Sequence, residues 1–251
     1  MSPKAKKQRL DVLLVERGLV DSRSRARALI MAGEVLVDDH PATKAGTPTP
    51  EDAEVRLRSE LQRFVSRGGV KLDGALTTFE LDVEGRVAID VGASTGGFTD
   101  CLLQRGAAKV FAVDVGYGQL AWKLRSDARV VGIERCNIRY LELEQLGQPC
   151  DLAVADVSFI SLSKILAPLS RLLVGGADCV LLVKPQFEVG KGNVGHGGVV
   201  RDEALRISAI EDVRQSAEAL GYTFLRGVDS TLAGPKGNLE HLIWLKWNPV
   251  A

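Results

Sequence analysis

Residues 90–100 have the sequence DVGASTGGFTD, and this stretch decides the fold. An apolar strand over Val87–Val91 precedes the first glycine, and a helix is expected to begin near Gly96-Gly97. A strand, a glycine-rich turn and a helix in this order form a ligand site at the carboxyl end of a strand in open α/β sheets. Glycines also let a ligand approach the backbone closely. The stretch therefore predicts a ligand site on an α/β sheet.

The spacing of the glycines narrows the choice of ligand. Dinucleotide-binding folds use G-x-G-x-x-G, whereas this turn has G-x-x-x-G-G, with Asp90 two residues before its first glycine. A pyrophosphate prefers bare amides, while a carboxylate favours a cationic ligand such as S-adenosylmethionine, which carries a sulfonium and an ammonium. Asp114 ends the next strand, where it can accept hydrogen bonds from ribose hydroxyls. A purely structural turn is the competing interpretation, and Asp114 makes it the weaker one.

Outward from this turn, the chain alternates apolar strands with helices. Strands are expected over 87–91, 109–114, 130–134, 152–156, 179–184, 222–228 and 240–247, and the longer helices over 161–174 and 201–220. This order predicts a mainly parallel sheet covered on both faces. The last two strands are joined without a helix, which predicts an antiparallel edge strand. The glycine-rich segment 186–200 is expected to be a functional loop.

The first segment predicts a smaller α+β unit. A helix from Leu10 to Arg17 ends at Gly18, and a second helix, capped by Ser22 or Ser24, runs to Ala32. Short strands are expected over 34–38 and 54–58, with a turn at His40-Pro41. We therefore expect an N-terminal domain over 1–62, a linker over 63–70 and a second domain over 71–251.

Charge is unevenly distributed although the chain is neutral overall. The 251 residues carry 32 basic and 32 acidic side chains, but the first 31 hold eight basic residues against three acidic ones. A basic end on a neutral protein predicts contact with a polyanion such as RNA; a solvated tail and helix face are the alternative. The candidate RNA-binding residues are Arg9, Arg23, Arg25 and Arg27.

Four charged residues are candidates for chemistry. Asp156 and Lys184 end two strands that are expected to be parallel, so their side chains should reach the same crevice as the cofactor. A lysine after four apolar residues is costly to bury unless it is paired or deprotonated. Lys71 and Glu240 lie at the two ends of the second domain. Two lysines and two carboxylates at one site could make one lysine a base, or they could form a salt-bridge network without catalysis.

Other classes of function lack support. The four cysteines form no C-x-x-C pair, so no metal site is expected. The run Asp156-Val-Ser-Phe159 differs from the Asn/Asp-Pro-Pro-aromatic run of base-amino methyltransferases, and Pro149-Cys150 lies at the wrong end of its strand for a nucleophile. The chain shows neither an apolar run of the roughly 20 residues that a membrane span needs nor a secretory signal. A cytoplasmic protein without a membrane partner is therefore expected.

With these residues in hand, the chain resembles the TlyA or hemolysin A family of ribosomal RNA 2′-O-methyltransferases over residues 9–248. The motifs that carry the resemblance are DSRSRAR (21–27), GEVLV (33–37), SRGGVKLDGAL (66–76), DVGASTGGFTD (90–100), DVGYGQLAWKLR (114–125), ADVSFISL (155–162), LVKPQFEVGKG (182–192) and GPKGNLEHLIWL (234–245). The resemblance implies an S4-type RNA-binding domain followed by an FtsJ-like domain with a Rossmann-type class I methyltransferase sheet.

The resemblance also implies roles for single residues. A Lys-Asp-Lys-Glu tetrad falls on Lys71, Asp156, Lys184 and Glu240, the same four that spacing proposed. Contacts to S-adenosylmethionine are implied for Asp90, Gly92, Ser94, Thr95, Gly96, Gly97, Phe98, Asp114, Val115, Gly116, Glu134 and Asn137. The expected substrates are cytidine 2′-hydroxyls in ribosomal RNA of the small subunit, the large subunit or both. Lys184 is the candidate to receive or steer the hydroxyl proton.

Two other functions remain open at this stage. One is a catalytically inactive module that binds ribosomes or RNA, and the other is a membrane-lysing protein, as the hemolysin name implies. An intact tetrad argues against the first. A basic N-terminal helix that is short and charged throughout argues against the second. The sequence does not determine the target nucleotide or the oligomeric state.

Overall fold

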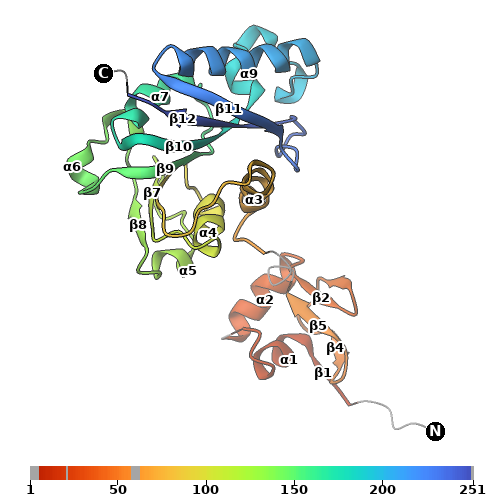
Figure 1. The fold of residues 1–251 in the computed structure, drawn as a ribbon. Coiled ribbons are helices and arrows are strands. Elements are labelled where there is room, and N and C mark those ends of the chain that lie inside the picture. The colour runs from red at the N-terminus through yellow and green to blue at the C-terminus, as the bar shows by residue number, and fades with distance from the viewer. Residues whose placement is uncertain (1–5, 21, 58–62, 250–251) are drawn as a thin grey trace. The chain divides into compact units, whose positions relative to one another are not determined.

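The computed structural model describes residues 6–20, 22–57 and 63–249 (Figure 1). By its internal contacts the chain divides into two units, Met1–Arg63 and Phe64–Ala251, and each is described here by itself. Helix α3 (Arg67–Phe79) begins inside the segment 63–70 that was expected to be a linker, so residues 67–70 are helical. Lys4, the expected strand end at Arg58 and the segment 59–62 lie outside the described residues.

The N-terminal unit consists of two short helices packed on two small sheets. Its elements are β1 (Lys7–Arg9), α1 (Leu10–Glu16), α2 (Arg23–Met31), β2 (Val35–Val37), β3 (His40–Ala42), β4 (Pro48–Pro50) and β5 (Val55–Leu57). Strands β3, β2 and β5 form an antiparallel sheet, and β1 pairs with β4. Leu10, Leu14 and Ile30 are fully buried between these elements. Ser22 caps α2 by accepting the amide of Arg25 at 3.3 Å, so the first of the two expected caps is the one used.

The expected turn at His40-Pro41 is wrong. Both residues belong to β3, and the hairpin turns instead through Asp38 and Asp39, whose φ angles are 48° and 65°. Two consecutive residues in the left-handed region match the tight turn that joins antiparallel strands, and aspartate tolerates that region better than most residues. Strands β1 and β4 were not expected, because each has only three residues and β4 begins and ends with proline.

The larger unit is built on a seven-stranded sheet in the order β11-β12-β10-β9-β6-β7-β8. Its strands are β6 (Val87–Val91), β7 (Lys109–Val113), β8 (Val130–Ile133), β9 (Cys150–Ala155), β10 (Leu173–Val183), β11 (Tyr222–Asp229) and β12 (His241–Trp247). Its α-helices after α3 are α4 (Gly97–Gln104), α5 (Trp122–Arg125), α6 (Leu143–Leu146), α7 (Ser163–Ser170), α8 (Pro185–Glu188) and α9 (Glu203–Glu218). The parallel α/β sheet that the sequence predicts is confirmed.

Both faces of this sheet are covered, as the apolar strands predict. Successive residues of β6 point to opposite faces, so Ile89 joins a core with α7 and α9, while Ala88 joins a second core with α3 and α4. Figure 1 shows α9 and α7 on one side of the sheet and α3 and α4 on the other. Because helices cover both faces, a ligand site is expected at the ends of the strands.

Three expectations about the larger unit need correction. The antiparallel strand is β12, and it lies between β10 and β11 rather than at the edge. The helix expected to run to Val174 ends at Ser170, because β10 begins at Leu173 and includes an irregular register before Asp178. The segment 186–200 is not one open loop, since it continues α8 and contains short 3₁₀ turns at Lys191–Asn193 and His196–Gly198.

Candidate active site

Three neighbouring strands bring charged residues to one edge of the sheet. Asp156 directly follows β9, and Lys184 directly follows the parallel strand β10. Glu240 directly precedes β12, which is antiparallel, so the start of β12 lies at the same edge. The last registered pair of β10 and β12 joins Val183 and His241, and Lys184 and Glu240 are the next residues outward. Sheet topology therefore gathers residues that are far apart in the sequence.

The four candidate residues form two ion pairs. Lys184 Nζ lies 2.5 Å from Asp156 Oδ1 and donates to Ser158 Oγ at 2.9 Å. Lys71, on α3, pairs with Glu240, and both side chains are buried. Lys184 and Asp156 keep 11% and 24% of their side chains exposed, against 8% and 1% for Lys71 and Glu240. A substrate can thus reach the Lys184–Asp156 pair more easily than the Lys71–Glu240 pair.

Helix α3 links the two pairs. Gly68 and Lys71 lie one helical turn apart, and a Cβ atom added at Gly68 would lie 3.6 Å from Asp156 Oδ2. The first turn of α3 therefore lies over Asp156, while its second turn supplies Lys71 to Glu240. The structure brings together all four residues proposed from the sequence, as an accessible pair and a buried pair.

The glycines of the 90–100 turn are required for close packing between segments. A Cβ atom at Gly92 would lie 2.7 Å from the backbone oxygen of Asp156, and one at Gly97 would lie 2.1 Å from Ser66 Oγ. At Gly96, whose φ is +95°, it would lie 2.2 Å from a methyl group of Leu124. These glycines allow protein segments to pack closely, and a contact between their backbone and a cofactor stays a prediction. Phe98 is buried in the core beside α3 and does not face a crevice.

Asp90 is fully buried, so its expected direct contact with a cofactor is not available in this conformation. Its Oδ2 accepts hydrogen bonds from the amide and the hydroxyl of Thr99, at 2.9 and 2.7 Å, and holds the start of α4. Its Oδ1 has no hydrogen-bond partner among the described residues. Burial raises the pKa of Asp90 to about 7, and the nearby charges of Asp156 and Asp114 also raise it.

A pocket opens beside the turn, at the carboxyl ends of β7 and β8. Its lining residues are Ala93, Ser94, Ala112, Asp114, Gly116, Gln119, Leu120, Gly132 and Glu134. Four of these residues were proposed as cofactor contacts, namely Ser94, Asp114, Gly116 and Glu134. Five were missed, and Gly132 near the end of β8 was the one with a visible signal, because a glycine inside an apolar strand often marks a close approach.

Several proposed cofactor contacts do not line this pocket. Thr95 and Val115 are exposed, and Val115 keeps 71% of its surface accessible to solvent. Asn137 accepts the amide of Arg139 at 3.1 Å and caps the 3₁₀ turn Ile138–Tyr140. Asp90, Gly92, Gly96, Gly97 and Phe98 serve packing, as described above. Their direct contact with a cofactor stays a prediction.

The pocket residues fit a cationic nucleoside ligand. Asp114 accepts the amide of Ser94 at 2.8 Å on Oδ2 and that of Gly116 at 2.6 Å on Oδ1, which leaves a lone pair on each oxygen for a ribose hydroxyl. Leu120 and Gly132 provide an apolar wall for a flat ring. Burial is the main cause of the raised pKa of Asp90, and the nearby charges of Asp156 and Asp114 add to it; a positively charged ligand would offset these charges.

Phe159 is a candidate that sequence reasoning missed. It lies three residues after Asp156, its φ is +64°, and 90% of its surface is exposed. Its only described ring contact is with Phe187 of α8, at 5.1 Å between centroids. An exposed aromatic ring beside a reactive pair can stack on a nucleic-acid base. The strained backbone and the exposure are both tertiary features, so the sequence carried no signal for this role.

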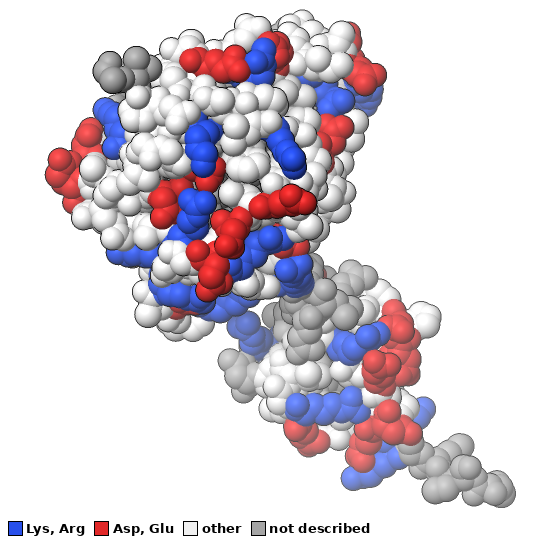
Figure 2. Space-filling view, viewed as in Figure 1, with Lys and Arg blue, Asp and Glu red and all other residues white. Residues whose placement is uncertain are grey.

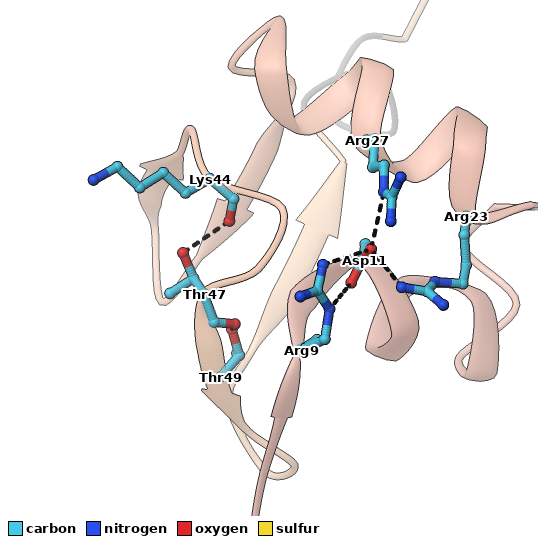
Figure 3. Close-up of polar contacts among 7 residues, drawn as sticks. All are labelled: Arg9, Asp11, Arg23, Arg27, Lys44, Thr47 and Thr49. Carbon is cyan, nitrogen blue, oxygen red and sulfur yellow. Dashed lines mark hydrogen bonds and ion pairs between the residues drawn. The ribbon is translucent and has the colours of Figure 1, made fainter.

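In the N-terminal unit, three of the four candidate RNA-binding arginines meet at one carboxylate. Arg9, Arg23 and Arg27 all pair with Asp11, at 2.9, 3.0 and 3.2 Å (Figure 3). Arg25 is exposed on another face of α2 and makes no side-chain contact with a described residue. Over the face of the molecule in Figure 2, basic and acidic side chains are interspersed, as the zero net charge predicts.

Fold and site together define a Rossmann-type α/β domain preceded by a small α+β unit, and the comparisons assign a family to each. The FtsJ-like methyltransferase family matches residues 64–247, and the S4 domain matches residues 8–55. The chain therefore belongs to the FtsJ-like methyltransferases and carries an S4 domain. The resemblance stated from the sequence is confirmed.

Similar proteins cover almost the whole chain. The 16S/23S rRNA (cytidine-2′-O)-methyltransferase TlyA of Mycobacterium tuberculosis is 50% identical over 96% of this chain and 91% of its own. Hemolysin A of Brachyspira hyodysenteriae is 39% identical over 93% of this chain and 98% of its own. The solved structure of a hemolysin-like protein from Streptococcus thermophilus is 42% identical, covers 97% of this chain and 90% of its own, and superposes with a TM-score of 0.75.

Proposed function

We propose that this methyltransferase transfers the methyl group of S-adenosylmethionine to cytidine 2′-hydroxyls of ribosomal RNA in the small subunit, the large subunit or both. The observation that carries the proposal is the accessible Lys184–Asp156 pair at the strand edge that also holds the Asp114 pocket. The relatives named for cytidine 2′-O-methylation support the substrate. The S4 domain supports RNA docking.

The cofactor would be held by Asp114 through its ribose and by the apolar wall at Leu120. When bound, it supplies an electrophilic methyl group on a positively charged sulfur. The carboxylates around the crevice favour that charge and would not favour a phosphate-bearing cofactor. This selectivity follows from the charges of the chain itself.

Lys184 is the residue that handles the proton of the ribose hydroxyl. Its ammonium is fixed by Asp156 and Ser158, so it holds a defined position against a substrate oxygen. In one role, Lys184 gives up its proton to solvent before the reaction and then accepts the hydroxyl proton. In the other, it remains a cation that orients the oxygen. Much of the acceleration comes from positioning in either role, because methyl transfer from a sulfonium is already favourable.

The buried pair supports the accessible one. Glu240 neutralises the charge of Lys71 inside the protein, so Lys71 does not present an unpaired positive charge to Asp156. Leaving either partner alone would bury an uncompensated charge, which costs several kcal/mol. We therefore expect Lys71 and Glu240 to act mainly by holding α3, and with it Gly68, over Asp156.

The test is direct methylation of defined RNA substrates. Purified protein is incubated with S-adenosylmethionine carrying a labelled methyl group and with small or large ribosomal subunits that lack ribose methylation. The expected product is a labelled 2′-O-methylcytidine at a single nucleotide of a subunit, absent when Lys184→Ala replaces the parent protein. Binding of ribosomes without any methylation would instead identify an inactive RNA-binding module.

Membrane lysis is the competing function suggested by the name of some relatives. Within residues 6–20, 22–57 and 63–249, no helix is long and apolar enough to cross a membrane. Leakage of dye from liposomes, measured with pure protein, addresses this function independently of methylation. Dose-dependent leakage by a Lys184→Ala variant would establish a lytic activity separate from the methyltransferase site.

A further inference from the structure

A buried aspartate organises the positive cluster of the N-terminal unit. Asp11 is fully buried, and its two oxygens receive four hydrogen bonds from three guanidinium groups. Arg9 comes from β1, whereas Arg23 and Arg27 lie four residues apart on α2 and share one face of that helix. Figure 3 shows the three side chains converging on Asp11 from different directions.

The role of Asp11 is not that of a helix cap. It lies in the first turn of α1, where backbone amides lack partners within the helix. Here the amides of Leu10 and Asp11 donate to the carbonyl oxygens of Thr47 and Ala45, in the loop before β4, at 3.1 and 3.0 Å. Because the amides are already satisfied, the carboxylate is left for the arginines. The contacts with Arg9, Arg23 and Arg27 hold the pKa of Asp11 far below its usual range, so it stays ionised.

The cluster still has unused binding capacity for an anion. Three arginines and one aspartate leave a net charge of +2. The three arginine side chains remain 51%, 51% and 55% exposed, and only part of each guanidinium's set of N–H donors is used by Asp11. Arg9 is further confined by Gly46, where an added Cβ would lie 3.3 Å from Nη1. Three half-exposed guanidiniums are thus held within a small area.

We propose that Asp11 is a positioning residue for RNA docking, which fixes Arg9, Arg23 and Arg27 as one preformed site for phosphate groups of the RNA backbone. This inference rests on the proposed function. Free arginine side chains lose considerable rotamer entropy when they bind. Since Asp11 orders them before RNA arrives, that entropy is lost on folding rather than on binding. Asp11 strengthens docking although it carries the same charge sign as RNA.

Simple electrostatics makes the opposite prediction. If only the number of charges matters, removing Asp11 raises the local charge from +2 to +3, so affinity for RNA rises and its salt dependence becomes steeper. If Asp11 positions the arginines, the same change weakens binding. The two explanations therefore differ in the sign of the effect.

The experiment measures binding of the full chain to ribosomal subunits over a range of salt concentrations. Asp11→Asn should weaken specific binding by about 10-fold or more, because three side chains lose their common anchor. It should also make the salt dependence shallower, since fewer phosphates are contacted at once. Glu51→Gln is the matched control: it removes one negative charge from the same unit, where the Glu51 carboxylate pairs with Lys6 at 3.6 Å. Its binding should equal that of the parent protein or be slightly tighter.

Two further measurements keep the outcome decisive. Thermal unfolding and cofactor affinity show whether the Asp11→Asn variant folds. If it does not fold, binding to ribosomal subunits is measured with the Arg27→Lys variant instead. Arg27→Lys retains the charge but replaces a planar fork by a point charge, so positioning predicts several-fold weaker binding and charge alone predicts none. Unchanged or tighter binding by a folded Asp11→Asn, or by Arg27→Lys in its place, overturns the inference.

The design also separates this inference from the function on which it rests. If Arg23→Glu/Arg27→Glu loses binding while Asp11→Asn keeps it, docking by the arginines stands and the positioning role of Asp11 fails. If the arginine variant also binds normally, RNA docking by the N-terminal unit itself is wrong.

Discussion

Asp11 and Asp90 are both fully buried, yet their surroundings differ in every other respect. Asp11, in the N-terminal unit, is surrounded by three arginines, which keep it ionised and leave an excess of positive charge. Asp90, in the larger unit, has no cationic partner and one unpaired oxygen among the residues that the structure describes; burial raises its pKa to about 7, and two nearby aspartates add to this. One unit therefore has spare positive charge for an anion, and the other has spare negative charge for a cation.

This contrast assigns the two ligands to different units. A neutral chain can bind both a polyanion and a sulfonium if each unit keeps its own local imbalance, because screening confines exposed charges to about 10 Å at moderate salt. The contrast also implies that RNA docking, cofactor binding and catalysis can be removed one at a time.

The largest effect is expected at Lys184, and it should leave both binding functions intact. Lys184→Ala should lower turnover on the order of 10²-fold or more, measured as single-turnover methylation at saturating cofactor. Cofactor affinity and ribosome binding should change little. Lys164→Ala, an exposed lysine on α7, is the control and should be silent.

A second variant at this position separates the two roles of Lys184. If it is the base, Lys184→Arg should stay inactive, because a guanidinium does not give up its proton, and the parent rate should rise with pH along one ionisation. Substantial activity in Lys184→Arg would instead assign the orienting role.

Charge reversal in the N-terminal unit is expected to have the next largest effect. Arg23→Glu/Arg27→Glu should abolish detectable ribosome binding, because it replaces two of the three guanidiniums at Asp11 by like charges. Affinity for S-adenosylmethionine should match that of the parent protein. Arg25→Glu, on another face of α2, should weaken binding much less. Normal methylation of ribosomes by the double variant would remove the N-terminal unit as the docking device.

Asp114→Ala should have an intermediate effect that is confined to the cofactor. Calorimetry should show binding of S-adenosylmethionine weakened by roughly 1–3 kcal/mol, the cost of leaving polar groups unpaired. Asp127→Ala provides a control, because Asp127 pairs with Arg129 on the surface of the same unit. Equal affinity in both variants would show that the pocket at β7 and β8 is not the cofactor site.

The smallest expected effect is on the free energy of unfolding. Replacing Asp90 should raise this free energy, whereas replacing an aspartate in an ion pair should lower it. Asp90 has a folded-state pKa of about 7, above its ordinary value of 3.8. Because an ionised carboxylate is costly to bury, Asp90 lowers the free energy of unfolding as the pH rises from 3.8 to about 7, and the full effect is present above that range. Asp90→Asn retains an acceptor for Thr99 and removes the buried charge. It should raise the free energy of unfolding at pH 8 by at least about 1 kcal/mol, the value of one pKa unit.

The gain from Asp90→Asn should disappear near pH 4, where Asp90 is protonated in the folded state. Asp100→Asn should do the opposite and destabilise the protein, because Asp100 is buried with the amide of Val65 at 2.8 Å and Lys123 at 2.9 Å. Thermal melts of both variants across pH provide the measurement. A loss of stability in Asp90→Asn at pH 8 would mean that Oδ1 has a partner that the structure does not describe.

Much of the larger unit was predictable because its signals are local. The strand Val87–Val91 and the helix after Gly97 follow from a short apolar run and a glycine turn. Asp156 and Lys184 were predictable as site residues because parallel strands end at the same edge. The role of the glycines was not predictable, since the atoms that a Cβ at Gly96 or Gly97 would meet belong to Leu124 and Ser66, in other elements.

The sequence by itself determined the family, the two-unit organisation, the parallel sheet and the four charged residues of the site. Only the tertiary structure decided how they combine: Lys71 with Glu240, 169 positions apart, β12 between β10 and β11, and Phe159 exposed beside Asp156. It also decided that Arg9, Arg23 and Arg27 share Asp11. The physical reason is range. Periodicity and turn residues record contacts between near neighbours, whereas the partner of a buried charge is selected by packing between segments that meet only when the chain is folded.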